Sequence, residues 1–205
     1  MIGQPFVAAP NSASLADMIA RASRTGKGQP PVDDWEPAFC GEINMEIKRD
    51  GTWFYLGTPI LRPAMVELFS SVLRKDADGK TYLVTPVEKL GITVEDAHFI
   101  GVELDVSGVE HNQALTLCTH VGDVVEIGPQ HVMRFEVEPL HGGIKPYIHV
   151  RGRLEALASR AVTHQLMALG EIIEIDGQPI FGLRSRGIIF PVMPADALEH
   201  DLDNS

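Results

Sequence analysis

Residues 50–91, DGTWFYLGTPILRPAMVELFSSVLRKDADGKTYLVTPVEKLG, contain the signals of a strand, a glycine loop, a helix, a turn and a second strand. Asp50-Gly51 lies between two runs of strand character, and this dipeptide tolerates the positive φ angles of a tight type I′ turn. We therefore expect a β-hairpin at this point. Residues 57–59, Gly-Thr-Pro, end the second strand. Pro63 predicts the start of a helix, because the first helical N–H has no partner to lose.

The predicted helix carries a single apolar stripe at the period of an α-helix. The stripe continues through residue 73, so Arg74 and Lys75 lie near the C-terminal end, where the helix dipole favours cations. Asp78-Gly79 then predicts a turn into a strand at residues 81–85. The residues of the stripe are Met65, Leu68, Phe69, Val72 and Leu73.

A similar plan recurs in residues 146–183. Residues 147–150 have strand character, residues 154–169 have helical character, and Asp176-Gly177 predicts a turn between two further strands. A repeat of this kind determines the whole fold and indicates an internal duplication. Chance similarity is the alternative, because a strand–helix–turn–strand plan is common. The residues that coincide at a fixed offset are Arg62 with Arg160, Leu68 with Leu166, Asp78 with Asp176 and Gly79 with Gly177.

The rest of the chain is rich in short strands. Residues 98–106 alternate between apolar and polar side chains, which predicts a strand whose even-numbered residues point inward. Many short strands and two or three helices predict an α+β fold made of two tandem, similar small αβ domains. The expected divisions are an N-terminal helix and linker at 1–39, a first αβ domain at 40–106, a second αβ domain at 107–195 and an acidic tail at 196–205.

Composition limits the classes of function. The chain has 205 residues, and its hydrophobic content of 44% supports a buried core. No apolar run approaches the roughly 18 residues of a membrane span, so we expect none. The formal net charge of −11 argues against wrapping a duplex nucleic acid, which requires a basic face. Cys40 and Cys118 do not make a disulfide framework, and they predict free thiols in a cytoplasmic protein.

Charge is distributed unevenly along the chain. Residues 88–138 are acidic, whereas residues 144–186 are basic. Free N–H groups at a helix N-terminus favour anions, and the planar fork of arginine can bind phosphate with two hydrogen bonds. The alternative is that Arg62, Arg151 and Arg160 pair with the acidic middle segment and hold the halves together. The candidate ligand-binding residues are Arg62, Lys89, His149, Arg151 and Arg160.

Other chemistries have weaker support. His120 and Asp123 are the nearest pair of candidate metal ligands, but no HExxH or CxxC motif accompanies them. Cys118 and His120 share a face of a predicted strand, yet the segment is acidic and disfavours a thiolate. Neither a dinucleotide-binding fingerprint nor a P-loop occurs. The aromatic run at 53–55 could stack a base, although a core and edge strand explains it as well. We assign no catalytic residues, metal or cofactor.

Several strings, in order, resemble an uncharacterised proteobacterial family, domain-of-unknown-function family 1285. The resemblance covers most of the chain, from about residue 34 to residue 192. It departs at residues 182–185, where Gly-Leu-Arg-Ser replaces a Gly-Val-Trp-Ser type of string. The strings are GTPILRP (57–63), LFSSVLR (68–74), YLVTPVEK (82–89), VEDA (94–97), YIHVRGRLEAL (147–157) and GIIFPV (187–192).

The resemblance implies two tandem, similar αβ domains, of which the second is loosely like a pleckstrin-homology barrel. It also implies a role in signalling through a nucleotide-like ligand between the domains, and it supplies no catalytic residues. We therefore expect a non-enzymatic protein that binds a small anionic ligand. The alternatives are a protein-interaction module that needs a protein partner but no small ligand, and a hydrolase with an unrecognised metal.

Overall fold

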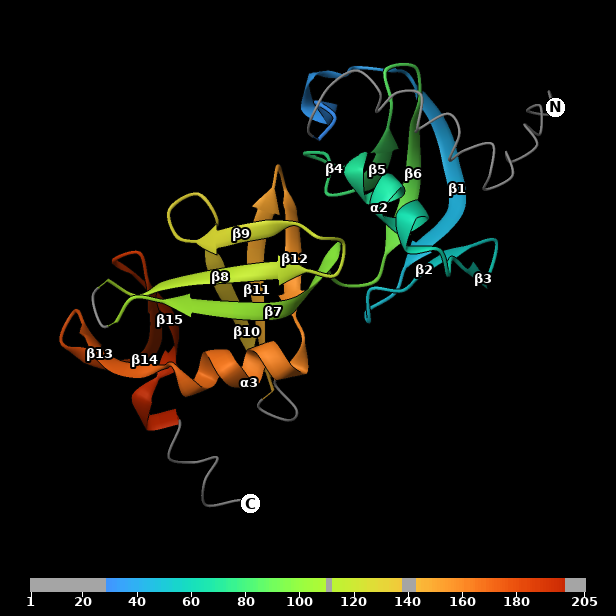
Figure 1. Ribbon diagram of the computed structural model, residues 1–205. Coiled ribbons are helices and arrows are strands. Elements are labelled where there is room, and N and C mark those ends of the chain that lie inside the picture. Colours follow the sequence, from blue (N-terminus) through green and yellow to red (C-terminus); the bar gives the residue numbers. More distant parts are fainter. Residues whose placement is uncertain (1–28, 110–111, 138–142, 198–205) are drawn as a thin grey trace. The chain divides into compact units, whose positions relative to one another are not determined.

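The structure is a computed structural model that describes residues 29–109, 112–137 and 143–197. The chain divides into two units, Met1–Glu95 and Asp96–Ser205 (Figure 1). The division falls before the expected boundary at residue 106, because strand β7 (Phe99–Ser107) pairs along its length with strands of the second unit. The expected N-terminal helix lies outside the described residues, as does the acidic tail beyond residue 197.

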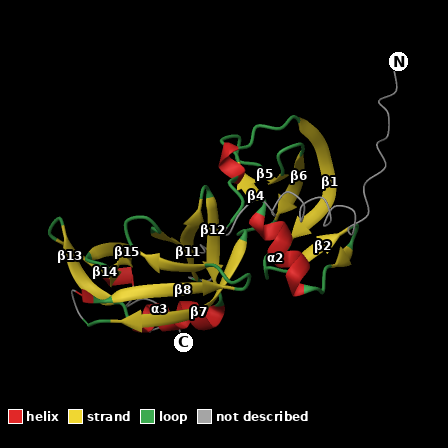
Figure 2. Ribbon diagram, turned by 45° about the horizontal axis from the view of Figure 1, so that its top comes forward, coloured by secondary structure: helices red, strands yellow, loops and turns green. Residues whose placement is uncertain are grey.

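The first unit is built around a six-stranded sheet in the order β3-β2-β1-β6-β5-β4 (Figures 1 and 2). β1 and β6 run parallel, whereas the other neighbouring strands are antiparallel. The strands are β1 (Phe39–Ile47), β2 (Trp53–Tyr55), β3 (Thr58–Pro59), β4 (Leu73–Lys75), β5 (Thr81–Val84) and β6 (Lys89–Val94), and the helices are the 3₁₀ turn η1 (Val32–Asp34) and α2 (Pro63–Ser71).

The core of the first unit joins helix α2 to the sheet. Trp53 of β2 is 1% exposed and stacks on Phe69 of α2, with ring centroids 6.1 Å apart. Met45 and Ile47 of β1 are fully buried. Burial of a large apolar side chain contributes about 2 kcal/mol relative to exposure. The contact between Trp53 and Phe69 therefore stabilises the packing of helix α2 on the sheet.

Helix α2 begins at Pro63, as predicted, but it ends at Ser71. The prediction of a helix through residue 73 is wrong, because Leu73–Lys75 forms strand β4 in a hairpin with β5. Pairing across this hairpin satisfies the backbone groups of β4 and overrides the helical period of the local sequence. Arg74 and Lys75 therefore lie on a strand and not at a helix C-terminus.

The hairpin between β1 and β2 is confirmed, but its turn differs from the predicted type. Gly51 has a positive φ of 83°, whereas Asp50 does not, so the two do not form a type I′ turn. The next turn along the chain has that character, because Leu56 and Gly57 have φ of 50° and 75°. Leu56 and Gly57 connect β2 to β3, and Tyr55 of β2 pairs with Thr58 of β3.

Leu56→Asn is expected to stabilise the first unit by about 1 kcal/mol, because a left-handed backbone costs a leucine about that much and costs asparagine less. Leu56 is 57% exposed, so little packing is lost. Urea unfolding followed by tryptophan fluorescence measures the change, since both tryptophans, Trp35 and Trp53, lie in the first unit. Leu61→Asn is the matched control, because Leu61 is 82% exposed and has no positive φ. An equal gain in both variants would contradict the explanation from φ.

The second unit contains a six-stranded sheet in the order β10-β11-β12-β7-β8-β9 and a three-stranded sheet in the order β13-β14-β15. β12 and β7 run parallel, and the other paired strands are antiparallel. Beside β7, its elements are β8 (Ala114–Thr119), β9 (Val124–Ile127), β10 (Met133–Val137), β11 (Ile144–Arg151), β12 (Leu154–Ala158), α3 (Arg160–Ala168), β13 (Glu171–Ile175), β14 (Gln178–Ser185) and β15 (Ile188–Pro194).

A buried serine joins the two sheets of the second unit. Ser185 of β14 is fully buried, and its hydroxyl donates to the carbonyl oxygen of Ile127 at 2.6 Å. The same hydroxyl accepts a hydrogen bond from the backbone N–H of Leu115 at 3.0 Å. The amide of Gln113 adds a bond of 2.8 Å to the carbonyl oxygen of Arg184. β14 is therefore tied to strands β8 and β9 by polar contacts.

The predicted helix at residues 154–169 begins later than expected. Residues Leu154–Ala158 form β12, with alternating burial, and α3 starts at Arg160. Ser159 caps the helix by accepting a hydrogen bond from the N–H of Val162. A serine before a helical run is a start signal that favours Ser159 as the boundary.

The prediction that the even-numbered residues of 98–106 point inward is wrong for the start of strand β7. Phe99 and Gly101 are buried, whereas Val102 is 48% exposed. The register of β7 against β8 shifts between Gly101 and Glu103, so the alternation changes there. After the shift, Leu104 is half-buried and pairs with buried Leu117, in agreement with the predicted pattern, whereas Val106 is 42% exposed and the prediction is wrong there too.

Part of the predicted repeat has a local counterpart in the structure. In each unit a nine-residue helix is followed by an antiparallel hairpin, with turns at Asp78-Gly79 and Asp176-Gly177. The hairpin β4–β5 belongs to the main sheet of its unit, whereas β13–β14 belongs to a separate sheet. The fold is thus two tandem domains that are mostly β-sheet with few helices (Figure 2). Within the described residues, no helix has the length and apolar character needed to cross a membrane.

Candidate functional site

A pocket of about 420 Å³ opens in the first unit where strand β3 leads into helix α2. Pockets of about 300–1,000 Å³ are the usual size for small ligands. The described residues of its lining are largely apolar and include one cationic side chain. The lining residues are Tyr55, Thr58, Pro59, Ile60, Leu61, Arg62 and Met65.

Local sequence explains why these side chains meet. The turn at Leu56-Gly57 folds β3 back on β2, which places Tyr55 opposite Thr58. The N–H of Ile60 donates to the carbonyl oxygen of Trp53 at 2.8 Å and holds the segment after β3 near β2. Pro63 then starts the helix, so the lining comes from one short stretch of chain.

Arg62 is the N-cap residue of α2 and is exposed. The helix has no side-chain cap at this end and no acidic residue in its first turn. Among the described residues, no carboxylate forms an ion pair with Arg62. The guanidinium of Arg62 therefore lies at the positive end of the helix dipole. A bound anion would stabilise this arrangement.

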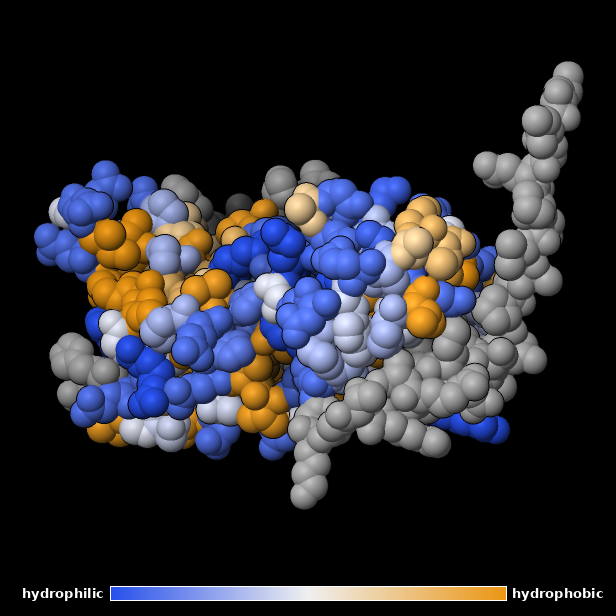
Figure 3. All heavy atoms as spheres, turned by 90° about the horizontal axis from the view of Figure 1, so that it is seen from above, coloured by the Kyte–Doolittle hydropathy of each residue, from blue (hydrophilic) through white to orange (hydrophobic). Residues whose placement is uncertain are grey.

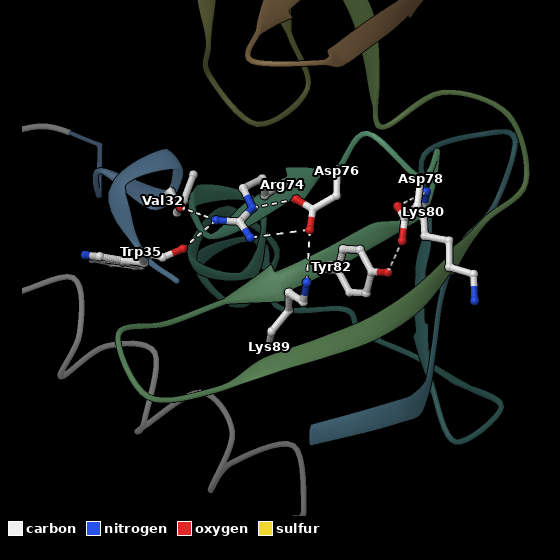
Figure 4. A network of polar contacts seen from close by, with 8 residues as sticks. All are labelled: Val32, Trp35, Arg74, Asp76, Asp78, Lys80, Tyr82 and Lys89. Atoms are coloured by element: carbon white, nitrogen blue, oxygen red, sulfur yellow. Dashed lines mark hydrogen bonds and ion pairs between the residues drawn. The ribbon is translucent and has the colours of Figure 1, made fainter. Parts of the chain in front are cut away.

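Lys89, also predicted as a ligand-binding residue, belongs to a polar network around Asp76 (Figure 4). Its ammonium group lies 3.1 Å from Asp76 and 4.6 Å from the centre of the Tyr82 ring. Arg74 binds the other side of Asp76 at 2.7 Å. The guanidinium of Arg74 also donates to the carbonyl oxygens of Val32 and Trp35, at 2.9 and 2.6 Å. The network thus attaches the η1 segment to the sheet, which is a structural role for Lys89.

The carboxylates of this network have lowered pKa values. Burial alone would raise the pKa of Asp76, but hydrogen bonds from Arg74 and Lys89 outweigh it and hold the pKa below the usual 3.8. Asp78 accepts a hydrogen bond of 2.6 Å from the Tyr82 hydroxyl, which lowers the pKa of Asp78. The same bond raises the pKa of Tyr82 to about 12.

Tyr82 is expected to titrate near pH 12, because its hydroxyl must give up the hydrogen bond to Asp78 on ionising. A raised pKa in the folded state gives stability that is present below the unfolded value, near 10. That stability is lost as pH rises towards 12. In Asp78→Ala the pKa of Tyr82 should fall towards 10. The ¹³Cζ resonance of labelled Tyr82 measures both titrations, and an unchanged midpoint in the variant would refute this cause.

In the second unit, His149 and Arg151 both have partners within the protein. The Nδ1 and Nε2 atoms of His149 lie 3.0 and 2.8 Å from the carbonyl oxygens of Gln130 and Gly152. Arg151 forms an ion pair of 2.7 Å with Asp123. This contact agrees with the alternative that Arg151 pairs with the acidic middle segment.

The five predicted residues therefore fall into two groups. Lys89, His149 and Arg151 have partners within their own units. Arg62 and Arg160 are exposed and occupy the starts of helices α2 and α3, with no ion pair to any described residue. Of these two, Arg62 alone lines the pocket. Tyr55 was considered only as part of the aromatic run at 53–55, and Met65 only as part of the helical stripe. The Leu56-Gly57 turn, which folds β3 back on β2, is the signal that could have assigned both to the pocket.

The residues considered for metal or thiol chemistry have structural contacts. The Nδ1 atom of His120 accepts a hydrogen bond of 3.1 Å from the N–H of Ile100. Asp123 is taken by Arg151, and the thiol of Cys118 contacts the carbonyl oxygen of Thr119 at 3.7 Å. Over the parts of the chain that the structure describes, no group of three or more His, Cys, Asp or Glu side chains could hold a metal ion.

The protein is thus a two-domain, mostly β protein, and its first domain has a pocket beside helix α2. The chain belongs to the DUF1285 family. Residues 30–97 match the model of the "Domain of unknown function (DUF1285), N-terminal domain", and residues 98–192 match that of the "Protein of unknown function (DUF1285), C-terminal domain". The resemblance found in the sequence is thereby confirmed.

Two solved structures of DUF1285 family proteins are similar to the chain. The protein from Silicibacter pomeroyi DSS-3 is 47% identical, with a TM-score of 0.83, and the match covers 94% of this chain and all of that one. The protein from Shewanella baltica OS155 is 26% identical, with a TM-score of 0.46, over 59% of this chain and 87% of that one. No curated protein matches the chain.

Proposed function

We propose that this protein binds a small anionic ligand in the pocket of its first domain, with Arg62 as the anion-binding residue. The proposal assigns binding and no reaction. One observation carries it: a cation without a described carboxylate partner lines a ligand-sized pocket at an uncapped helix start. A guanidinium binds a carboxylate or a phosphate through charge-assisted hydrogen bonds, which are stronger than those between neutral groups.

Several finer predictions belong to this proposal. A nucleotide is one member of the ligand class, and a role in signalling follows from the family resemblance. The pleckstrin-homology likeness of the second domain and the internal duplication are hypotheses of the same standing. An anion shared by residues of both domains stays a prediction, and the site proposed here needs only residues of the first.

A thermal-shift panel tests the proposal. The panel contains inorganic phosphate, nucleotides and small carboxylates, and the tryptophan fluorescence of the first unit reports unfolding. A ligand at a hundredfold over its Kd stabilises by about 2.7 kcal/mol, which raises Tm by roughly 5–10 °C. Arg62→Gln should abolish the shift, whereas Arg160→Gln, the other exposed arginine at a helix start, should retain it. A panel without any shift, or a shift that survives Arg62→Gln, would sink the proposal.

A protein-interaction module is the second candidate. Exposed large apolar side chains in the second unit favour it, and on the face drawn in Figure 3 apolar residues interrupt the hydrophilic surface there. Single exposed residues are normal, whereas a contiguous patch would mark an interface. Co-purification of a stoichiometric partner, lost when Val102 and Val124 are both changed to Thr, would support this candidate. Those residues are 48% and 66% exposed.

A further inference from the structure

The pocket of the first domain has a lining that distinguishes between classes of anion. We infer, resting on the proposed function, that it takes a monocarboxylate attached to a hydrocarbon body, and not a nucleotide. Two properties carry the inference, namely the number of cations in the lining and the apolar character of everything around them.

The described residues of the lining carry a single charge. Among them Arg62 is the only cation, Thr58 and Tyr55 add uncharged hydroxyl groups, and the others are apolar. A terminal nucleotide phosphate carries about −1.5 to −2 charges at pH 7, and placing charge without a partner in a pocket is costly. A carboxylate brings one negative charge and matches the planar fork of a guanidinium with two parallel hydrogen bonds. Charge balance therefore selects a monoanion.

Two other cations of the first domain are already paired with a carboxylate. Lys89 and Arg74 both bind Asp76, and Arg74 also binds two backbone carbonyl groups. If either cation moved to bind a second negative charge of a ligand, the half-buried carboxylate of Asp76 would lose one of its partners. Lys89 and Arg74 are thus held by Asp76 and are not free to bind a second negative charge.

The remainder of the pocket favours a hydrocarbon body. Pro59, Ile60 and Met65 supply apolar walls. Leu61 of the lining is 82% exposed, and Leu56, next to Tyr55 in the chain, is 57% exposed. A ligand chain lying across these leucines would remove apolar surface from water.

The volume of the pocket suggests a ligand length to test first. The volume of about 420 Å³ is comparable with that of on the order of a dozen water molecules in the liquid, at about 30 Å³ each. A straight-chain carboxylate of eight to ten carbons has about that many non-hydrogen atoms. Octanoate is therefore the probe that we would use first.

Isothermal titration calorimetry of the full chain tests the inference. The probes are butanoate, hexanoate and octanoate, with octanamide as the uncharged analogue and AMP as the nucleotide. Affinity should rise about fourfold for each added methylene, as expected for apolar burial. Octanoate should bind at least about tenfold more tightly than octanamide, because only the carboxylate pairs with Arg62.

Two matched variants locate the effect. Arg62→Gln should weaken octanoate at least about tenfold and make it equal to octanamide. Arg160→Gln should change affinity by less than about twofold, because Arg160 is not among the residues that line the pocket. Arg62 is exposed, so Arg62→Gln should unfold at the same urea concentration as the wild type, which separates lost binding from lost folding.

The outcomes separate the two proposals. Binding of AMP that needs Arg62, without binding of octanoate, would overturn the inference and leave the proposed function standing. Binding of neither probe, with no other anion of the thermal-shift panel active, would overturn both. Equal binding of octanoate and octanamide, unchanged in Arg62→Gln, would show an apolar site without anion recognition and would also overturn both.

Discussion

Arg74→Ala is expected to lower the free energy of unfolding of the first domain by about 3 kcal/mol. The side chain of Arg74 is 10% exposed and donates to Asp76 and to the carbonyl oxygens of Val32 and Trp35 (Figure 4). Its removal leaves a half-buried carboxylate with Lys89 as the remaining basic partner and takes a donor from both carbonyl groups. Urea unfolding followed by tryptophan fluorescence measures the loss.

Lys80→Ala is the matched control for this experiment. Lys80 also forms an ion pair in the first domain, with Glu42 at 3.5 Å, but both side chains are at least 65% exposed. Exposed pairs contribute about 0–1 kcal/mol, so the control should scarcely change the midpoint. A loss in Arg74→Ala no larger than that in Lys80→Ala would contradict the structural role of the network.

The effect of Arg74 should also depend on pH. The pKa of Asp76 is held below 3.8 in the folded domain, so its contribution is present above that value. As pH falls through the lowered pKa, Asp76 takes up a proton and the contribution is lost. The difference in the free energy of unfolding between the wild type and Arg74→Ala should therefore become smaller at acidic pH.

Ser185→Ala is expected to destabilise the second domain by about 3 kcal/mol, because it removes both the donor to Ile127 and the acceptor for Leu115. The site is fully buried, so water cannot replace the lost bonds without opening the structure. Urea unfolding followed by circular dichroism measures the loss.

Ser107→Ala serves as its control, since Ser107 is exposed and its hydroxyl makes only a 3.5 Å contact with the carbonyl oxygen of Ala114. The control should differ from the wild type by less than about 0.5 kcal/mol. Equal stability of the two serine variants would mean that Ser185 does not hold the sheets of the second domain together.

Turn chemistry made much of the fold predictable. Hairpins form at Asp50-Gly51, Asp78-Gly79 and Asp176-Gly177, and helix α2 begins at Pro63. These signals act locally, through allowed φ angles and the missing N–H of proline. The positions of these turns and of this helix start therefore depend little on distant parts of the chain.

Helix boundaries were less predictable, because they depend on distant pairing. The helical period continues through Leu73, but residues Leu73–Lys75 form β4, which pairs with β5 in a hairpin. Likewise, Leu154–Ala158 has helix-forming residues, yet it becomes β12 because β11 and β7 flank it. Tertiary context overrides propensity in both cases.

The candidate site was predictable only in part. A cation before a helix-starting proline identified Arg62, but the pocket needed the left-handed turn at Leu56, which no turn rule assigns to leucine. Lys89, His149 and Arg151 were chosen for their charge or their place on a strand. Their partners, Asp76, Gln130 and Asp123, are residues that sequence spacing does not connect to them.

The methyl resonance of Met65 offers the most direct test of the claim that this pocket binds a small anion. Met65 lines the pocket beside Arg62, and Met65→Leu assigns its signal among the seven methionines. We expect a saturable shift of this resonance when octanoate is titrated into the ¹³C-methyl-labelled protein, retained in Arg160→Gln and absent in Arg62→Gln. A Met65 signal that stays in place while octanoate saturates the protein would contradict the account.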